Sequence, residues 1–195
     1  MIANLKRPKG DVAFPEPDDI FKTSLFGIPV IQNWCDLWLW EKMFENSPQV
    51  KAVIELGTLY GGLSQYLLCQ TIARGMHFRT FDWQRYLTVG PLAQRLGLAE
   101  CFIHDDLWAG GLAKFQVLVD QDDWHPLLLL ADDGNKPKEL ATFVPLLRPG
   151  DIIAVHDWGT EVSDGDLDPI RSMVRLYLPD LCDKIDGMTL WMERI

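Results

Sequence analysis

Residues 127–158 read LLLLADDGNKPKELATFVPLLRPGDIIAVHDW, and this stretch decides the fold. The apolar runs near its two ends predict strands over residues 126–131 and 151–156. Between them we predict a helix over residues 137–147, because a proline is well tolerated in the first turn of a helix. Pro149-Gly150 marks the turn into the second strand. Strands without polar alternation are typical of central strands covered on both faces, so the stretch predicts a β-α-β unit of a parallel sheet.

The rest of the chain continues this alternation of strands and helices. We predict further strands over residues 50–56, 78–82 and 101–104, and further helices over residues 33–46, 63–74, 92–98, 113–120 and 168–177. A hairpin over residues 181–195, turning near Asp186-Gly187, would end the chain. The predicted fold class is α/β: a three-layer, Rossmann-like, doubly wound and mostly parallel sheet with a C-terminal antiparallel hairpin. Residues 1–33 are interpreted as an irregular N-terminal lead-in or lid, and residues 34–195 as a single domain.

The composition argues against several classes of protein. The 195 residues suit one domain at roughly 150 residues per domain. The net charge of −10 argues against nucleic acid or an anionic membrane as a partner. The longest aliphatic run, residues 127–131, is far shorter than the ~18 residues of a membrane span. No apolar segment follows the basic residues near the N-terminus, and the cysteines at 35, 69, 101 and 182 lack metal-ligand spacing. We therefore expect a cytoplasmic protein with reduced thiols.

An acid and several glycines follow the first strand of the predicted sheet. Glu55 ends that strand, Gly57 suits a tight turn, and Gly61 and Gly62 would let a ligand approach the backbone where the next helix begins. The spacing departs from the Gly-x-Gly-x-x-Gly of dinucleotide sites. A carboxylate at this position would repel a pyrophosphate and attract an ammonium group. A plain strand-to-helix turn is the alternative interpretation.

Acidic and aromatic residues follow the next two strands. Asp82 lies 25 positions beyond Gly57, and an acid about 20 residues past the glycine turn suits the two hydroxyls of a ribose. Trp83 could pack on a base. Either Asp105 or Asp106, after the third strand, could accept a hydrogen bond from the exocyclic amine of adenine. Aspartates of ordinary turns or helix caps are the alternative.

The last two parallel strands end in acids and a histidine. Asp132 and Asp133 follow one strand, and His156 and Asp157 stand at the end of the other. Because the carboxyl ends of parallel strands meet at one edge of the sheet, these side chains should converge. Acids there could hold a hard divalent cation, and His156 or an acid could act as a general base toward a substrate hydroxyl. Hydrogen bonding within the loops is the alternative.

Taken together, these strand-end residues resemble those of a known family. The Glu-x-Gly-x-x-x-Gly-Gly turn, the acids at 82 and 105–106, and the 127–158 block are similar to class I S-adenosylmethionine-dependent methyltransferases. In particular they resemble the branch of cephalosporin hydroxylase-like and macrocin-O-methyltransferase-like proteins, over roughly residues 34–160. The resemblance implies a Rossmann-like fold, S-adenosylmethionine as cofactor, and residues 34–195 as a single methyltransferase-like domain.

The resemblance also implies a role for each matching residue. Asp82 would hold the ribose, and Asp132 would lie at the site of methyl transfer. The adenine would be held by Asp105 or Asp106, with Trp83 or Trp108 nearby. The methionine part of the cofactor would lie against Glu55 and a bed shaped by Gly57, Tyr60, Gly61 and Gly62.

A magnesium site is a further implication of the resemblance. In metal-dependent relatives, an acid at the 132 position and acids at the fifth strand bind Mg²⁺. Here the fifth strand ends in His156-Asp157-Trp158, so only Asp132 and Asp157 match that pattern cleanly. Two carboxylates completed by waters would then hold the metal.

The predicted function is S-adenosylmethionine-dependent O-methylation of a small-molecule or glycan-type acceptor. The sulfonium methyl is already activated, so the protein mainly has to place the nucleophile. His156 or Asp157 would remove the hydroxyl proton, or a metal at Asp132 and Asp157 would lower the pKa of the hydroxyl. A non-catalytic cofactor-binding or accessory protein is the first alternative, and an NAD-dependent oxidoreductase is the second. The tryptophans at 34, 38 and 40 indicate core, or an interface in a homo-oligomer.

Overall fold

The computed structural model describes residues 23–32, 34–84, 91–182 and 188–195. The predicted helix cap at Asn33 and the predicted turn at Asp186-Gly187 lie outside these residues. The strands are β1 (Thr23–Leu25), β2 (Ile28–Val30), β3 (Ala52–Leu56), β4 (His77–Asp82), β5 (Phe102–His104), β6 (Leu127–Ala131), β7 (Ile152–Val155), β8 (Val174–Leu176) and β9 (Leu190–Arg194). The α-helices are α2 (Trp34–Asn46), α3 (Gly62–Arg74), α4 (Pro91–Leu96), α5 (Leu98–Cys101), α6 (Leu112–Val119), α7 (Lys136–Phe143) and α8 (Pro179–Cys182). Shorter helical turns are η1 (Leu107–Gly111), η2 (Asp122–Trp124), η3 (Val144–Leu146) and η4 (Asp164–Leu167).

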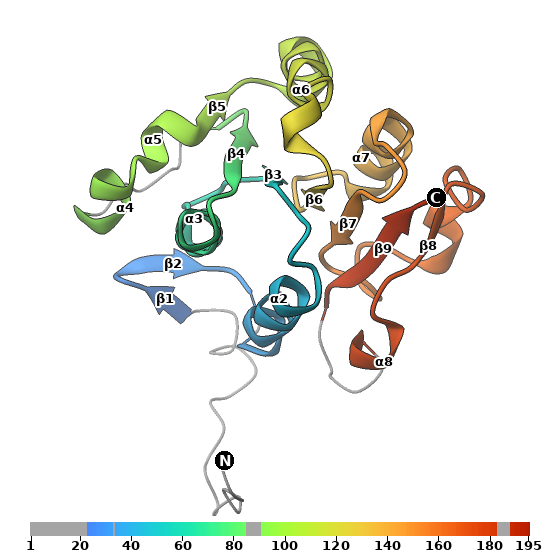
Figure 1. Cartoon of the computed structure of the whole chain (residues 1–195), viewed down its shortest axis with the longest axis horizontal. Helices are drawn as coiled ribbons and strands as arrows, with labels where there is room; N and C mark the ends of the chain where they lie inside the picture. Colours follow the sequence, from blue (N-terminus) through green and yellow to red (C-terminus); the bar gives the residue numbers. More distant parts are fainter. Residues whose placement is uncertain (1–22, 33, 85–90, 183–187) are drawn as a thin grey trace, which may run out of the picture.

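Seven strands form one sheet, in the order β5-β4-β3-β6-β7-β9-β8 (Figure 1). Neighbours from β5 to β7 run parallel, whereas β9 runs antiparallel to β7 and β8. The chain order reverses at β3, where Leu56 is paired with Phe81 on one side and Ala131 on the other. Open α/β sheets bind ligands beside the carboxyl ends of the strands at such a reversal. The predicted fold class, including the antiparallel pair at the C-terminal end, is confirmed.

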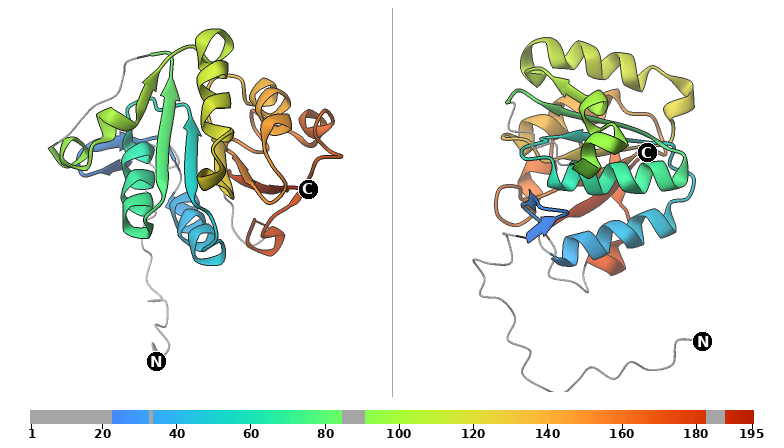
Figure 2. Two further views of the ribbon diagram at one scale, coloured as in Figure 1. Left: turned by 45° about the horizontal axis from the view of Figure 1, so that its top comes forward. Right: turned by 90° about the vertical axis from the view of Figure 1, so that its left-hand side faces the viewer.

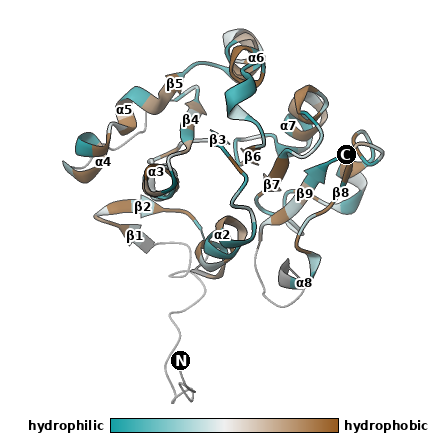
Figure 3. Cartoon of the chain, viewed as in Figure 1, coloured by the Kyte–Doolittle hydropathy of each residue, from teal (hydrophilic) through white to brown (hydrophobic). Residues whose placement is uncertain are grey.

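Helices cover both faces of the sheet and make three layers (Figures 1 and 2). On one face Phe143 of α7 belongs to the same buried cluster as Leu129 of β6, and on the other face Leu67 of α3 belongs to the cluster that holds Leu128. Leu128 and Leu129 point to opposite faces because side chains alternate along a strand. In Figure 3, β7 is hydrophobic along its length, whereas the helices carry both kinds of residue. That contrast is expected of a central strand covered on both sides.

Two tryptophans of α2, Trp38 and Trp40, differ in their burial. Trp40 is fully buried and meets Trp191 of β9 edge to face, with ring centroids 4.7 Å apart. Trp38 is 43% exposed, so it stays a candidate for an interface between copies of the chain. No helix in the described part of the chain is long and apolar enough to cross a membrane.

A β-hairpin forms within the segment that we predicted to be irregular. Strands β1 and β2 pair antiparallel around the turn Phe26-Gly27, in which both residues have positive φ. Ile28 and Val30 alternate with the exposed Pro29 and are buried against the domain. This burial requires the first turn of α3 as a partner, so residues 23–30 could not be recognised as strands locally.

The predicted helix over residues 168–177 is wrong. Residues 174–176 form β8 instead, an edge strand that pairs with β9. Arg175 is paired directly with Glu193, and its Nη2 lies 2.6 Å from Glu193 Oε2. Among the described residues, β9 therefore pairs with β8 on one side and with β7 on the other. Pairing with a strand brought near by the fold outweighs the local preference of these residues.

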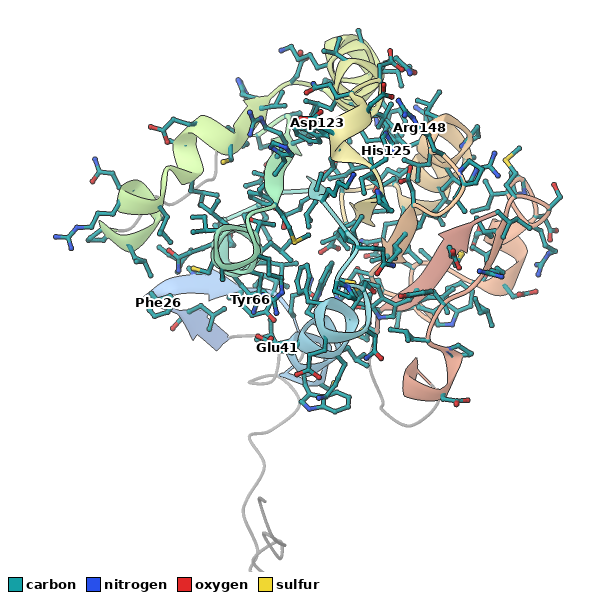
Figure 4. All side chains as sticks on the ribbon, viewed as in Figure 1. Phe26, Glu41, Tyr66, Asp123, His125 and Arg148 are labelled. Carbon is teal, nitrogen blue, oxygen red and sulfur yellow. The ribbon has the colours of Figure 1, made fainter. Side chains whose placement is uncertain are left out.

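Polar side chains fasten the amino-terminal edge of the sheet, near the His125 and Arg148 labels of Figure 4. Asp151 accepts hydrogen bonds from the backbone N–H of Leu127 and of Arg148, each at 2.8 Å. The ring of His125 lies 2.8 Å from Asp151 Oδ1 through Nδ1 and 2.8 Å from the Val119 carbonyl oxygen through Nε2. These bonds join the starts of β6 and β7 to the end of α6, on the edge opposite the strand ends that carry the predicted site.

We predict that Gly62→Ala destabilises the protein, whereas Gly134→Ala does not. A Cβ at Gly62 would lie 2.0 Å from the Pro29 carbonyl oxygen, so the hairpin would have to move off α3. We expect a loss of about 1–3 kcal/mol in the free energy of unfolding. A Cβ at Gly134 meets no atom within 4 Å, so that control should stay within about 0.5 kcal/mol of wild type. Urea unfolding measures the stability of both variants. Equal stability would contradict the close contact between Gly62 and the backbone at Pro29.

Candidate active site

A cavity of about 480 Å³ lies at the carboxyl ends of the parallel strands. Its walls are the loops that follow β3, β4, β6 and β7, together with the end of the hairpin and Glu161. The predicted site residues that line it are Gly57, Tyr60, Gly61, Gly62, Asp82, Trp83, Asp132, His156 and Asp157. The structure therefore brings together most of the residues that the sequence singled out.

Glycines shape the floor of this cavity. Gly57 has φ of 97°, and a Cβ there would lie 2.3 Å from the Asp132 carbonyl oxygen. Gly61 has φ of 83° and immediately precedes α3. A side chain at 57 would push the β3–α3 loop away from the end of β6. The absence of side chains thus keeps the predicted cofactor bed in contact with the backbone of Asp132.

Glu55 lies behind the cavity floor and not on the cavity wall. Its side chain is fully buried, and its Oε2 accepts a hydrogen bond of 2.5 Å from Ser64 Oγ in α3. Its Oε1 is buried without a hydrogen-bond partner. Burial raises the pKa of Glu55 to about 8, more than the hydrogen bonds of Ser64 and Thr80 lower it. Its contact with the methionine part of a cofactor stays a prediction.

Asp82 lies at the end of β4, on the cavity wall. Its Oδ2 accepts from the backbone N–H of Leu59 at 2.7 Å, and its Oδ1 accepts from that of Gln84 at 2.8 Å. The residue is 5% exposed, so these two bonds fix the carboxylate in one orientation. Each oxygen keeps acceptor capacity beyond its one backbone bond. Trp83, 57% exposed, stands beside it at the rim.

The predicted adenine acids engage other partners. Asp105 Oδ2 lies 2.6 Å from Lys114 Nζ, and Asp106 Oδ1 accepts from the backbone N–H of Trp108 at 2.8 Å, as the cap of η1. Trp108 packs against Phe143 with ring centroids 5.8 Å apart. Among the described residues none of these three lines the cavity. Their contact with adenine stays a prediction.

The predicted catalytic residues form one cluster at the other end of the cavity. His156 Nδ1 lies 3.2 Å from Asp132 Oδ1 and 3.3 Å from Asp157 Oδ1. Asp132 Oδ2 also accepts from Gln32 Nε2 at 2.8 Å, which links the cluster to the N-terminal hairpin. Sequence reasoning missed Gln32, since 100 positions separate it from Asp132.

Lys136 is the most important residue that sequence reasoning missed. It is the first residue of α7, it is 5% exposed, and its Nζ lies 2.8 Å from Asp157 Oδ2 and 3.6 Å from Asp132 Oδ1. Glu161 Oε2 lies 2.8 Å from the same nitrogen. The sequence did contain a signal for this residue. Lys136 follows Asp132 by four positions, and the helix that begins at Lys136 keeps both residues near the end of the strand.

The charges of the cluster stabilise one another. Burial lowers the pKa of His156, but the hydrogen bonds and charges of Asp132 and Asp157 outweigh burial and raise it to about 10. The same carboxylates raise the pKa of Lys136 despite its burial. Burial favours the neutral form of Asp157, but His156 and Lys136 together hold its pKa well below its usual range. At neutral pH both cations and the Asp157 carboxylate therefore stay charged.

A second carboxylate lies behind His156. Asp36 of α2 is fully buried, with its Oδ2 4.0 Å from His156 Nε2. Asp36 Oδ1 accepts hydrogen bonds from Thr189 Oγ1 at 2.8 Å and from the backbone N–H of Met188 at 3.1 Å. The histidine is thus enclosed between elements from both ends of the chain.

The cluster fits a magnesium ion poorly. Asp132, His156 and Asp157 do offer three ligand atoms within 4.8 Å of one another. Magnesium prefers oxygen ligands in octahedral geometry, whereas one of these ligands is an imidazole whose Nδ1 faces two carboxylates. The Lys136 ammonium already lies against both carboxylates that would hold the metal. The predicted Mg²⁺ site at Asp132 and Asp157 is therefore not supported by this arrangement.

Comparison with known proteins bears on the fold. No family model and no curated protein matches the sequence. An apo structure of CmcI superposes with a TM-score of 0.65 at 15% identity, over 89% of this chain and 76% of that one. A Mg-SAM form of CmcI gives a TM-score of 0.64 at 14% identity, over 89% and 76%. A candidate O-methyltransferase from Klebsiella pneumoniae gives a TM-score of 0.51 at 15% identity, over 86% and 84%.

The chain adopts the class I methyltransferase fold. The family resemblance stated from the strand-end motifs is thereby confirmed at the level of the fold. Those motifs fall where the fold places its ligand cavity, at the carboxyl ends of β3, β4, β6 and β7.

We predict that Glu55→Gln becomes more stable relative to wild type as the pH rises. The unfolded chain releases the Glu55 proton near pH 4.5, whereas the folded protein holds it until about pH 8. The stability that this proton contributes is complete below pH 4.5 and is lost as the pH rises to about 8. Urea unfolding at pH 5 and pH 8 measures the free energy of unfolding of both proteins. Between these two pH values, the difference in this free energy should change in favour of the variant by on the order of a few kcal/mol.

Glu45→Gln is the matched control for this measurement. Glu45 is exposed on α2, where it pairs with Lys42, so its replacement should leave the pH dependence of stability as in wild type. The same pH dependence in wild type and Glu55→Gln would show that Glu55 does not hold its proton in the folded protein.

Proposed function

We propose that this chain is an S-adenosylmethionine-dependent methyltransferase that acts on an oxygen atom of a small-molecule or glycan-type acceptor. One observation carries the proposal: a single cavity joins the oriented carboxylate of Asp82 to the charged cluster around Asp132, across a floor of glycines. This arrangement has one end suited to a nucleoside and another suited to proton transfer. The class I methyltransferase fold supports the same conclusion.

The cofactor would lie along the glycine floor. The two oxygens of Asp82, each with one backbone bond, would accept from the two ribose hydroxyls. Leu59, Tyr60 and Trp83 line the cavity and are each at least 40% exposed, so they would offer apolar surface to the adenine and the ribose. The methionine part would extend over Gly57 toward Asp132, because the floor continues in that direction.

The acceptor hydroxyl would lie beside Asp132. In the transfer, a bond forms between the acceptor oxygen and the methyl carbon, the bond from that carbon to sulfur breaks, and the hydroxyl proton leaves. A pKa of about 10 keeps His156 protonated at neutral pH, so we assign the proton to the Asp132 carboxylate and not to His156. His156 and Lys136 would then hold Asp132 and Asp157 in place. The protein's main contribution is this placement.

The surroundings of the protein are part of the proposal. The cysteines at 35, 69 and 101 form no disulfide with one another in the described part of the chain, which suits a reducing compartment such as the cytoplasm. The described part of the chain presents no membrane-crossing helix, and the net charge of −10 favours small molecules over nucleic acid as partners.

We predict that Asp82→Asn weakens the binding of S-adenosylmethionine and S-adenosylhomocysteine. The amide keeps the size of the carboxylate but loses one acceptor and the charge, so the dissociation constant should rise about tenfold to a hundredfold. Isothermal titration measures it, with NAD as the competing candidate ligand and thermal melting to verify that the variant folds.

Asp123→Asn is the matched control, because Asp123 has an exposed side chain outside the cavity wall. It should leave cofactor binding as in wild type. Asp105→Asn tests the predicted adenine contact, and a loss confined to that variant would move the nucleoside end toward β5. Binding of NAD in place of the sulfonium cofactor would contradict the proposal and favour an oxidoreductase.

A further inference from the structure

Two buried cations share two carboxylates at the acceptor end of the cavity. Lys136 Nζ lies 2.8 Å from Asp157 Oδ2 and 3.6 Å from Asp132 Oδ1. His156 Nδ1 lies 3.2 Å from Asp132 Oδ1 and 3.3 Å from Asp157 Oδ1. Lys136 and His156 thus each contact both acids.

Lys136 is held in this position by its place in the fold. It opens α7, where the backbone N–H of Asp133 and of Asn135 both donate to the buried carboxyl group of Glu139, at 3.3 and 3.1 Å. Its side chain is 6% exposed. Burying a lysine costs both hydration and side-chain freedom, which only close carboxylates offset. The ammonium therefore belongs to the site and is not a surface lysine that happens to reach it.

The loop after β7 adds a third carboxylate. Asp157 has φ of 60°, and its carbonyl oxygen accepts from the backbone N–H groups of residues 160, 161 and 162. This tight turn brings Glu161 Oε2 to 2.8 Å from Lys136 Nζ. The loop thus places a third carboxylate beside the ammonium.

A divalent cation could not share this position with the ammonium. An ion bound to Asp132 and Asp157 would lie within a few ångströms of Lys136 Nζ, where repulsion in a poorly hydrated site is strong. Lys136 cannot withdraw far, since its backbone is fixed at the start of α7. His156 Nδ1 lies between the same two acids, 3.2 Å from Asp132 Oδ1 and 3.3 Å from Asp157 Oδ1.

We propose that the Lys136 ammonium occupies the cation position of this site, so that the chain binds its ligands without a divalent metal. The occupancy itself does not depend on methyl transfer. Its effect on catalysis rests on the proposed function, because the acceptor oxygen would then meet a fixed ammonium group where a metal ion would otherwise lie. Lys136 would act as a positioning residue for Asp132 and Asp157 and as a fixed positive charge beside the oxygen.

The test is the binding of Mn²⁺ and Mg²⁺ to the full chain after treatment with a chelator. We expect wild type to bind no stoichiometric Mn²⁺ or Mg²⁺ at Asp132 at metal concentrations up to roughly 1 mM. This concentration is about the dissociation constant of the weakest carboxylate sites. Lys136→Met removes the ammonium charge and nearly keeps the length of the side chain, so Asp132 and Asp157 would keep only the His156 ring as a basic neighbour. The variant should therefore bind Mn²⁺ at least about tenfold more tightly than wild type. Electron paramagnetic resonance of free Mn²⁺ and isothermal titration of Mg²⁺ measure these affinities.

Two further variants locate the gained site. Lys138→Met changes an exposed lysine in the same helical turn, which lies over Trp108, and should behave as wild type. Adding Asp132→Asn to Lys136→Met should abolish the gained binding. Thermal melting verifies folding, and Lys136→Gln replaces Lys136→Met if the latter does not fold.

Two results would overturn the inference. One is stoichiometric binding of Mg²⁺ or Mn²⁺ to wild type that Asp132→Asn removes, a result that needs no Lys136 variant. The other is a folded Lys136→Met or Lys136→Gln that binds no more metal than wild type. Titration of S-adenosylmethionine with and without chelator tests the proposed function separately from the metal site. If the cofactor does not bind, the proposed function is refuted, but the metal results still decide the inference about Lys136.

Discussion

The contact between Gly57 and the carbonyl group of Asp132 is the constraint on which the site depends. A Cβ at 57 would lie 2.3 Å from that oxygen, so the loops after β3 and β6 can touch only because residue 57 has no side chain. Their contact joins the two strands at which the order of the sheet reverses. One cavity therefore extends from Asp82 to Asp132 instead of two separate depressions at neighbouring strand ends.

The N-terminal hairpin completes this cavity from outside the sheet. Gly62 lets the backbone at Pro29 rest on the first turn of α3, and the chain then places Gln32 within 2.8 Å of Asp132. A segment that precedes the sheet in the chain thus contributes directly to the orientation of the proposed proton acceptor. Glu55, buried behind the same turn, supports the floor through Ser64.

The charged cluster holds basic side chains between its acids. The Mg-SAM form of CmcI shares the architecture, but here Lys136 and His156 supply the positive charge between Asp132 and Asp157. Glu161 and Asp36 add further acidic groups beside the same two residues. The chain thus supplies its own basic partners for the acids at this end of the cavity.

From the sequence alone we could predict the alternation of strands and helices, the parallel sheet, and the convergence of Asp82, Asp132 and His156 at one edge. These follow from local periodicity and from the rule that parallel strands end on the same side. Only the tertiary structure decided that residues 174–176 form an edge strand, because pairing with β9 supplies their hydrogen bonds. Only it placed Glu55 behind the floor and Lys136 between the acids, since burial and contacts between distant residues depend on the packed neighbours and not on the local pattern.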